Sequence, residues 1–230
     1  MLSKKQQEIV ETKEKYVVVM ASVSAGKTRV LTERVRHLLK TGVPAHKIVV
    51  ITFTNAAAGE MRRRLGEDAP GGLKIMTVHS YANHLLSRYN IPTAELIQEE
   101  DFDGFFELIK EYPRVIQEVE HLLLDEAQDS DENQVEFLMN YVRPKNFFLV
   151  GDVRQAIYSF AGSDPQLLLD IMIQKDVAVY SLNENYRNGK DILEFAKRLL
   201  SRSGLRDNAI AMTDETGEVM EMELNVPDII

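Results

Sequence analysis

Three short segments of this 230-residue chain carry side chains that could act on a phosphate. The first is ASVSAGKT, residues 21–28, which lies between an apolar run and an amphipathic stretch and ends in Lys27 and Thr28. Backbone N–H groups at such a strand-to-helix turn can bind phosphates. Lys27 would bring a positive charge to the outer phosphates, and the Thr28 hydroxyl would be a magnesium ligand. The alternative is an ordinary turn with a surface lysine, since the segment holds a single glycine, Gly26.

The second segment, HLLLDEAQD, ends an apolar run with two adjacent carboxylates, Asp125 and Glu126. An aspartate in that position can bind magnesium, and the neighbouring glutamate can orient or deprotonate an attacking water. Acidic pairs at strand ends are common, so this segment gains its meaning from the phosphate loop. Together, the two segments indicate a nucleotide hydrolase.

The third segment, FFLVGDVRQAIYSF, places Asp152 and Gln155 after another apolar run and then two aromatic residues, Tyr158 and Phe160. A glutamine there could sense a terminal phosphate. An exposed aromatic ring could stack on a base of single-stranded nucleic acid without reading its sequence. We expect Tyr158 to pack in the core instead.

The elements that must position these side chains are strands alternating with helices. Continuous apolar runs predict parallel strands that are covered on both faces. Helical periodicity between them predicts a three-layer α/β domain, with ligands at the carboxyl ends of the strands. The predicted strands are 16–20, 47–53, 73–78, 121–126, 146–152 and 176–182, and the predicted helices are 27–41, 56–66, 79–88, 130–141 and 189–203.

Two regions depart from this alternation. Residues 89–120 are acidic and helical in pattern, and they stand between two predicted strands as a small insertion. After the polar stretch 201–208, the segment GEVMEMEL predicts one more strand, which would belong to another domain. The expected organisation is a motor domain formed by 1–88 and 121–205, an insertion at 89–120, and the start of a second domain at 206–230.

Composition limits the other possibilities. The net charge of −9 opposes nucleic-acid binding over the whole surface, because phosphate contacts need clustered Lys and Arg. Two local basic groups, 62–64 and Arg34 with Arg36 and Lys40, are expected to be solvated helix faces. No cysteine is present, and no apolar run is long enough for a membrane span. We expect a cytoplasmic protein with no membrane partner.

Seven ordered blocks resemble superfamily 1 helicases of the UvrD, Rep and PcrA type. They cover nearly the whole chain: LSKKQQEIV, ASVSAGKTRV, ITFTNAAAGEMRRRL, MTVHSYANHLL, LLLDEAQDSDENQ, LVGDVRQAIYSFAGSDP and LNENYRNGKDIL. The resemblance implies a RecA-like P-loop NTPase domain with a mainly parallel sheet. It makes the insertion at 89–120 a reduced form of that family's 1B subdomain.

The resemblance also implies a role for individual residues. For ATP, it implies adenine contacts by Gln6 and Tyr186, a phosphate loop of Ser24, Ala25, Gly26, Lys27 and Thr28, and Arg29 near the nucleotide. For catalysis, it implies magnesium binding by Thr28 and Asp125, water activation by Glu126, and γ-phosphate contacts by Gln155 and Arg187. For single-stranded DNA, it implies base stacking by Phe53 and Phe160, with Thr52, Asn55, His79 and Ser80 close to the backbone.

The sequence departs from the family pattern at several positions. Ser24 replaces a glycine, which costs roughly 1 kcal/mol if the position needs a positive φ. Ala56 and Ala161 stand where the family has lysine and arginine, so the DNA track loses positive charge. The blocks of a second RecA-like domain do not occur.

We therefore expect an ATP- and magnesium-dependent motor domain that moves on single-stranded DNA and needs a second motor domain or partner for unwinding. The alternative is a nucleotide- or DNA-binding regulatory module with negligible ATP hydrolysis. A small-molecule kinase with the same phosphate loop is a third possibility, in which the DEAQD and NYR blocks would have no role.

Overall fold

The computed structural model describes residues 1–156, 162–202 and 208–213. The chain divides into two units, the first made of residues 1–21 and 26–182 and the second of residues 22–25 and 183–230. Of the sequence-based expectations, Tyr158, Phe160, Ala161 and the strand in GEVMEMEL lie outside the described residues.

The first unit is built on a parallel six-stranded sheet with the order β3-β2-β4-β5-β1-β6. Its strands are β1 (Tyr16–Ala21), β2 (Ile48–Ile51), β3 (Lys74–Met76), β4 (His121–Leu124), β5 (Asn146–Gly151) and β6 (Val177–Leu182). Five of these six strands fall inside a predicted run, and β1 extends one residue beyond its run, to Ala21. The expected α/β fold with a mainly parallel sheet is confirmed, and the apolar residues are continuous because helices cover both faces.

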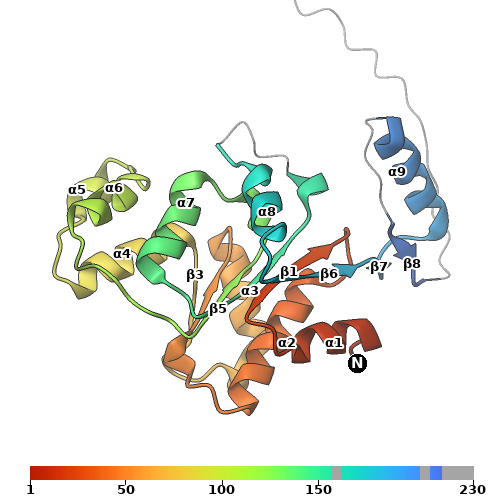
Figure 1. Ribbon diagram of the computed structural model, residues 1–230, viewed down its shortest axis with the longest axis horizontal. Helices are drawn as coiled ribbons and strands as arrows, with labels where there is room; N and C mark the ends of the chain where they lie inside the picture. The colour runs from red at the N-terminus through yellow and green to blue at the C-terminus, as the bar shows by residue number, and fades with distance from the viewer. Residues whose placement is uncertain (157–161, 203–207, 214–230) are drawn as a thin grey trace, which may run out of the picture. The chain divides into compact units, whose positions relative to one another are not determined.

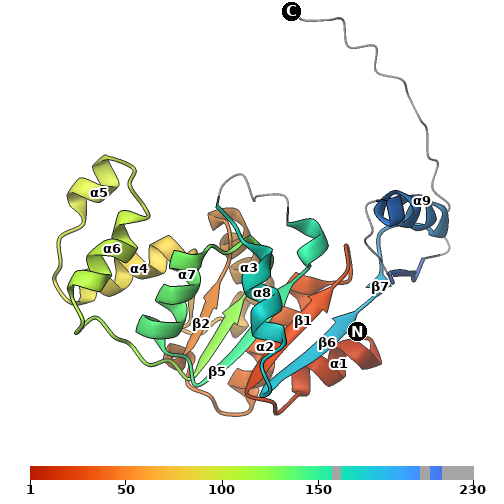
Figure 2. The same ribbon diagram turned by 45° about the horizontal axis from the view of Figure 1, so that its top comes forward.

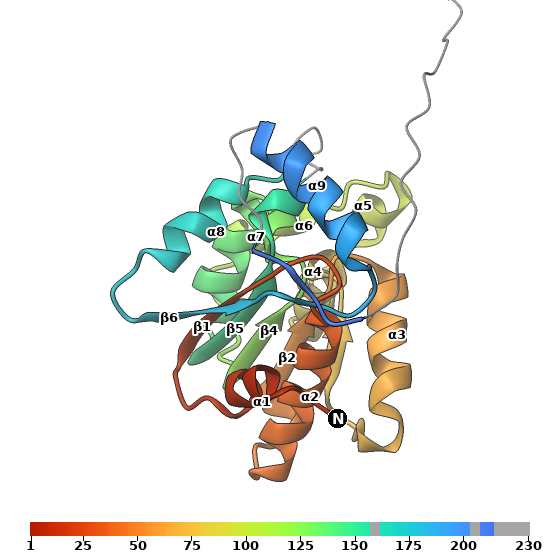
Figure 3. The same cartoon turned by 90° about the vertical axis from the view of Figure 1, so that its right-hand side faces the viewer.

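Most helices of this unit lie between consecutive strands in the chain, and α1 precedes the first strand. They are α1 (Lys4–Glu11), α2 (Lys27–Lys40), α3 (Asn55–Leu65), α4 (Val78–Arg88), α5 (Ala94–Gln98), α6 (Gly104–Glu111), α7 (Glu132–Phe137) and α8 (Pro165–Met172). Figures 1 and 3 show α1 and α2 on one face of the sheet and α7 and α8 on the other. The predicted helix 130–141 is shorter as an α-helix, because a π-helical turn, Leu138–Val142, follows α7.

One core cluster joins the sheet to α4, α6, α7 and α8. Val18, Ile51, Leu124 and Leu149 contribute from the strands and are almost fully buried. Tyr81 of α4 and Phe106 of α6 are buried in the same cluster, so the insertion shares the core of the motor fold. Figure 2 shows α5 and α6 beside α4. Among the described residues, no helix has both the length and the apolar character that a membrane crossing requires.

Arg34 corrects an expectation about basic surface groups. The sequence places it with Arg36 and Lys40 on a solvated face, but its side chain is buried in α2. Its Nη1 donates to the carbonyl oxygens of Val10 at 2.7 Å and Thr12 at 2.8 Å. These carbonyls lie at the end of α1, where helix C-termini lack intrahelical donors. Arg34 therefore ties α1 to α2 and contributes no exposed charge.

The second unit has a short parallel pair, β7 (Glu184–Asn185) and β8 (Ile210–Ala211), and the helix α9 (Lys190–Arg202). Asn185 is buried and organises it. Its Nδ2 donates to the carbonyl oxygen of Val23 at 2.9 Å, and its Oδ1 accepts from the backbone N–H groups of Arg187 and Asn188. The chain segment 22–25 is thereby joined to the NYR block inside one unit.

Candidate functional site

Lys27 lies at the first turn of α2, directly after Gly26. Gly26 has φ of +85° and begins the helix, which favours glycine because a side chain is strained there. The Lys27 Nζ donates to Glu126 Oε2 at 2.5 Å and lies 3.4 Å from Gln155 Oε1. Lys27 follows β1 in the chain, Glu126 follows β4, and Gln155 follows β5. The fold thus brings these three side chains together at the carboxyl edge of the sheet. A helix N-terminus and an ammonium group on one side give this cluster the charge that a phosphate needs.

The carboxyl groups of Asp125 and Asp129, near Lys27, have raised pKa values. Asp125 is 5 % exposed, and its Oδ1 accepts from the backbone N–H of Glu126 at 3.1 Å. Burial, followed by repulsion from Glu126, raises the pKa of Asp125 to about 6 and that of Asp129 to about 6. Lys27 opposes both shifts. A bound cation would relieve the same repulsion, so the site is suited to a positive ligand.

Gln128 is a residue of this cluster to which the sequence assigned no role. It is 1 % exposed, and its Nε2 donates to Glu126 Oε2 at 3.0 Å and to Asp129 Oδ2 at 3.2 Å. Its Oε1 accepts from the backbone N–H of Asp152 at 2.9 Å. A Cβ at Gly151 would lie 2.7 Å from that Oε1, so the glycine makes room for the amide. The DEAQD block itself was the available signal.

Asp152 positions Gln155. Its Oδ2 accepts from Gln155 Nε2 at 2.7 Å, and its Oδ1 accepts from Arg154 Nε at 2.7 Å. The carboxamide oxygen of Gln155 is therefore directed to the Lys27 side of the cluster. A group that senses a phosphate must be held in one orientation, and the buried Asp152 carboxylate provides that constraint.

The donor set fits magnesium only with help from a phosphate. Among the described residues, no group of three His, Cys, Asp or Glu side chains is arranged to hold a metal ion. Magnesium prefers oxygen ligands, keeps several waters and takes one or two carboxylates in nucleotide sites. Asp125 supplies one carboxylate and Thr28 supplies a hydroxyl at the start of α2, which together match that requirement.

Gln6 and Arg29 are two further residues that we expect near the nucleotide, and Gln6 is buried whereas Arg29 is exposed. Gln6 is buried, and its Oε1 accepts from the Ser3 backbone N–H at 3.1 Å within a capping box for α1. Its Nε2 would be 3.0 Å from a Cβ at Gly26, which places the amide beside the phosphate loop. Arg29 is exposed, and its Nη2 donates to the Met1 carbonyl oxygen at 2.8 Å.

The remaining residues that we expect to contact the nucleotide belong to the second unit. Ser24 has φ of +59°, so the position where the family has glycine does need the left-handed conformation. Its carbonyl oxygen accepts from the Tyr186 backbone N–H at 3.2 Å. Ala25 is buried, whereas Tyr186 and Arg187 are exposed. The Tyr186 hydroxyl donates to Glu184 Oε2 at 2.8 Å.

The residues expected to contact DNA gather at the ends of β2 and β3. A cavity of about 520 Å³ is lined by Phe53, Asn55, His79 and Ser80, four of the six expected residues. Thr52 is buried and donates to the Thr54 carbonyl oxygen at 3.0 Å, so it supports the turn and does not line the cavity. Phe160 lies outside the described residues.

Comparisons with known proteins identify the family of this chain. The family model described as the UvrD/REP helicase N-terminal domain matches residues 2–112 and 105–176, and the chain belongs to that family. The ATP-dependent DNA helicase PcrA of Leuconostoc citreum is 27% identical over 89% of this chain and 40% of its own length. The ATP-dependent DNA helicase Rep of Escherichia coli K12 is 25% identical over 86% of this chain and 43% of its own length.

A solved structure supports the fold. The PRRSV helicase matches with a TM-score of 0.50 and 15% sequence identity, covering 91% of this chain and 37% of that one. At this identity the match bears on the fold alone. The chain spans about 40% of the length of the PcrA and Rep relatives described above.

Proposed function

We propose that this chain binds and hydrolyses ATP as the first motor domain of a UvrD-type helicase, with single-stranded DNA as its polymer partner, in the cytoplasm. The observation that carries the proposal is the cluster of Lys27, Glu126 and Gln155, three side chains from three strand ends within hydrogen-bond reach. The side chain of an ordinary surface lysine extends into solvent. Lys27 instead contacts a carboxylate and an amide in a cluster that includes buried Asp125.

The proposed roles follow from this geometry. Lys27 leaves Glu126 and neutralises the outer phosphates, and the released Glu126 carboxylate accepts the proton of the attacking water. The carboxamide of Gln155, which Asp152 holds in one orientation, senses the terminal phosphate. Magnesium, when bound, neutralises phosphate charge, with Asp125 and Thr28 as its protein ligands.

The other roles rest on the family blocks. We propose that Gln6 and Tyr186 contact adenine, that Ser24, Ala25 and Gly26 present backbone N–H groups to phosphates, and that Arg29 and Arg187 lie near the nucleotide. The assignment of 206–230 as the start of a second RecA-like domain, and the need for a second motor domain or a partner for unwinding, are part of the same proposal.

The test is steady-state ATP hydrolysis by the 230-residue chain, with and without single-stranded DNA. We expect turnover that DNA stimulates, and a loss of about 10²–10³-fold in Glu126→Gln. Glu132→Gln, which changes a carboxylate at the first turn of α7, is the matched control and should keep full activity. Binding of MgATP with no turnover in the wild-type chain would instead favour the regulatory binding module.

A further inference from the structure

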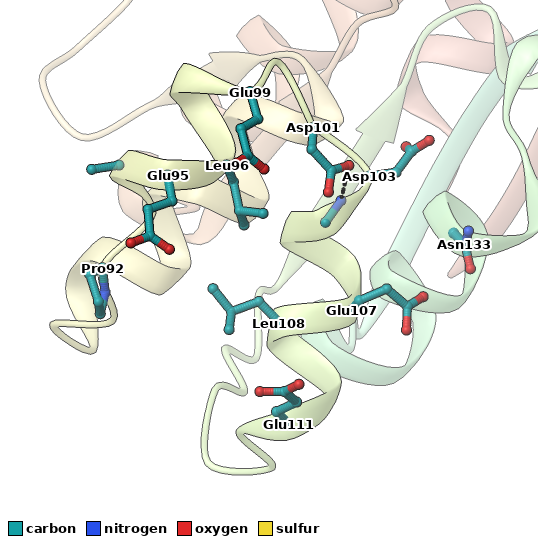
Figure 4. A pocket seen from close by; sticks show the side chains of 12 residues that line it. Pro92, Glu95, Leu96, Glu99, Asp101, Asp103, Glu107, Leu108, Glu111 and Asn133 are labelled. Atoms are coloured by element: carbon teal, nitrogen blue, oxygen red, sulfur yellow. Dashed lines mark hydrogen bonds between the residues drawn. The ribbon is translucent and has the colours of Figure 1, made fainter.

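A groove runs between α5 and α6 on the insertion, and none of its lining residues is among those assigned to ATP or DNA. Its volume is about 670 Å³. Figure 4 shows side chains of α5 on one side of the groove and side chains of α6 on the other. Asn133 of α7 is the lining residue that comes from outside the insertion. The groove is therefore a feature of the insertion itself.

The rim of this groove is strongly acidic. Six exposed carboxylates line it: Glu95, Glu99, Asp101, Asp103, Glu107 and Glu111. Residues 92–112 hold seven Asp or Glu and one basic residue, Lys110, so this segment carries a net charge of −6 out of −9 for the whole chain. Like charges gathered around a hollow produce a negative potential that attracts cations.

Most of this charge is not neutralised within the chain. The Lys110 Nζ lies 2.9 Å from Glu107 Oε1 and 3.2 Å from Glu136 Oε2, so it is shared with a carboxylate outside the groove. Glu95, Glu99 and Glu111 form no ion pair with any residue that the structure describes. These three carboxylates are available to a positively charged partner.

The floor of the groove is apolar. Leu96 of α5 and Leu108 of α6 are half-buried and pack against the core, and Figure 4 shows both pointing into the space between the two helices. Pro92 and Ala94 add further apolar surface to the lining. A solvated acidic face has no such floor, because apolar surface that is left in contact with water costs free energy.

The shape of the groove is fixed by the packing of α5 against the start of α6. A Cβ at Gly104 would lie 2.7 Å from Leu96 Cδ2, so the glycine allows this close approach. Asp101 Oδ1 accepts from the Gly104 N–H at 3.0 Å, and Phe105 and Phe106 anchor the opposite side of α6 in the core. A groove that is formed before binding loses little conformational entropy when a partner arrives.

The two kinds of surface together select the occupant. The carboxylates repel the phosphates of a nucleic acid. Among the described residues, no group of three His, Cys, Asp or Glu side chains is arranged to hold a metal ion. A small polycation would pair with the carboxylates and leave the two leucines exposed. An amphipathic helix that carries Lys or Arg beside an apolar stripe covers both, and a groove between two helices accepts the ridge of a third.

We propose that the groove between α5 and α6 docks a basic amphipathic helix of a partner protein. An apolar side chain of that helix lies between Leu96 and Leu108, and its Lys or Arg side chains face the carboxylates of the rim. Charge steers the association, and the apolar contact holds the complex. This inference goes beyond the proposed function and does not depend on it, because the groove shares no residue with the Lys27 cluster.

The first experiment tests the need for an apolar stripe. The probe is a fluorescein-labelled peptide of about 14 Lys, Ala and Leu residues, whose leucines recur at helical spacing. A control peptide has the same composition in an order that gives no apolar face. We expect fluorescence anisotropy with the full chain at physiological salt to show binding of the amphipathic peptide that is about 10-fold tighter. Equal affinities, or no binding, would overturn the proposal.

The second experiment tests the acidic rim. The double variant Glu99→Lys, Glu111→Lys reverses two charges at the C-terminal ends of α5 and α6, where lysine is compatible with the helix dipole. We expect it to weaken binding of the amphipathic peptide by about 10-fold. The matched control Glu14→Lys, Asp176→Lys reverses two exposed carboxylates outside the groove and should stay within about two-fold of wild type. Equal losses in both would assign the effect to net charge and overturn the proposal.

A third experiment locates the contact. An amphipathic peptide that carries a photoreactive leucine is irradiated with the full chain, and trypsin then releases peptide 89–110, which holds Leu96 and Leu108. We expect cross-links in 89–110, whereas cross-links that occur only elsewhere would overturn the proposal. Displacement of the peptide by an equal concentration of spermidine would assign the groove to a small polycation and overturn it as well.

The outcomes for this groove and for the proposed function are separate. ATP turnover without DNA should be unchanged in the Glu99→Lys, Glu111→Lys protein, and thermal melting of each variant checks the fold. A wild-type chain that hydrolyses ATP and binds neither peptide would overturn this inference and leave the proposed function intact.

Discussion

The carboxyl edge of the sheet has two parts that use different forces. The ends of β1, β4 and β5 bring together Lys27, Glu126 and Gln155, which interact through charge and hydrogen bonds over 2.5–3.4 Å. The ends of β2 and β3 present Phe53 and His79, which offer ring faces in an open cavity. Charge interactions in a confined site are strong and depend on pH, whereas stacking depends on contact area and tolerates any base.

The difference shows how one edge of a sheet can present two kinds of chemistry. In the order β3-β2-β4-β5-β1-β6, the aromatic strand ends are neighbours and the charged strand ends are neighbours. β2 and β4 pair directly, and the Asp125 N–H donates to the Ile51 carbonyl oxygen at 2.9 Å. The two parts are therefore adjacent and share backbone, but each keeps its own chemistry. The predictions below test whether they are energetically independent.

The largest effect is expected for Lys27→Ala. The change removes the charge that pairs with Glu126, so ATP turnover should fall by about 10²–10³-fold. Affinity for oligothymidylate should remain within about two-fold, because Lys27 does not line the aromatic cavity. Lys40→Ala, at the other end of α2, is the control and should leave both unchanged. A parallel loss of DNA affinity would show that the two parts are coupled.

An intermediate effect is expected for Asp125→Asn in the absence of nucleotide and metal. The pKa of Asp125 is raised from 3.8 to about 6, so the folded state holds the extra proton and the free energy of unfolding falls as pH rises through that window. The asparagine has no charge to bury, and it should raise the free energy of unfolding by about 3 kcal/mol above pH 6. Below about pH 4 the two proteins should be equal.

Urea unfolding across this pH range measures the difference between Asp125→Asn and wild type. Asp176→Asn changes an exposed carboxylate and should follow wild type throughout. Equal stabilities of Asp125→Asn and wild type above pH 6 would contradict the assignment of electrostatic stress to the charged part.

The smallest effect is expected for Asp103→Asn. The asparagine keeps an oxygen that can accept from His79 but removes a negative charge from the rim of the aromatic cavity. Affinity for oligothymidylate should rise by about two-fold at low salt, because exposed charges contribute about 0.2–1 kcal/mol. ATP turnover without DNA should not change. A fall in affinity would mean that the contact between the Asp103 carboxylate and the His79 ring is needed to orient the histidine.

Most of the fold could be predicted because its signals are local. The strands β1, β2, β4 and β5 lie in mostly continuous apolar runs, and α2 begins and ends near glycines, Gly26 and Gly42, that both have positive φ. The need for a left-handed residue at Ser24 was also predictable from the phosphate-loop pattern, and the structure gives φ of +59°. Local patterns did not reveal the burial of Arg34, because its partners are carbonyl groups of another helix.

The candidate site was predicted residue by residue but not as a network. Asp125, Glu126 and Gln155 stand out as polar groups after apolar runs, whereas Gln128 lies in the DEAQD block between a predicted strand and a predicted helix and was given no role. Its role depends on the N–H of Asp152, which directly follows the neighbouring strand β5 and lies 2.9 Å from Gln128 Oε1 because β4 and β5 pair. The sequence provided no indication that Phe102 would line a cavity, because a single aromatic residue in an acidic segment forms no periodic pattern. Its position in a cavity with Phe53 depends on tertiary packing.

The sequence by itself determined the strand and helix order, the phosphate loop, the acidic pair and the family, because each depends on residue types at short spacing. Only the tertiary structure decided which strand ends are neighbours and which side chains therefore meet. Lys27 contacts Glu126, and Phe102 lines a cavity with Phe53, because strand order and helix packing bring together residues that are distant in the chain. Contacts of that kind are set by the packing of the whole core, which no local pattern contains.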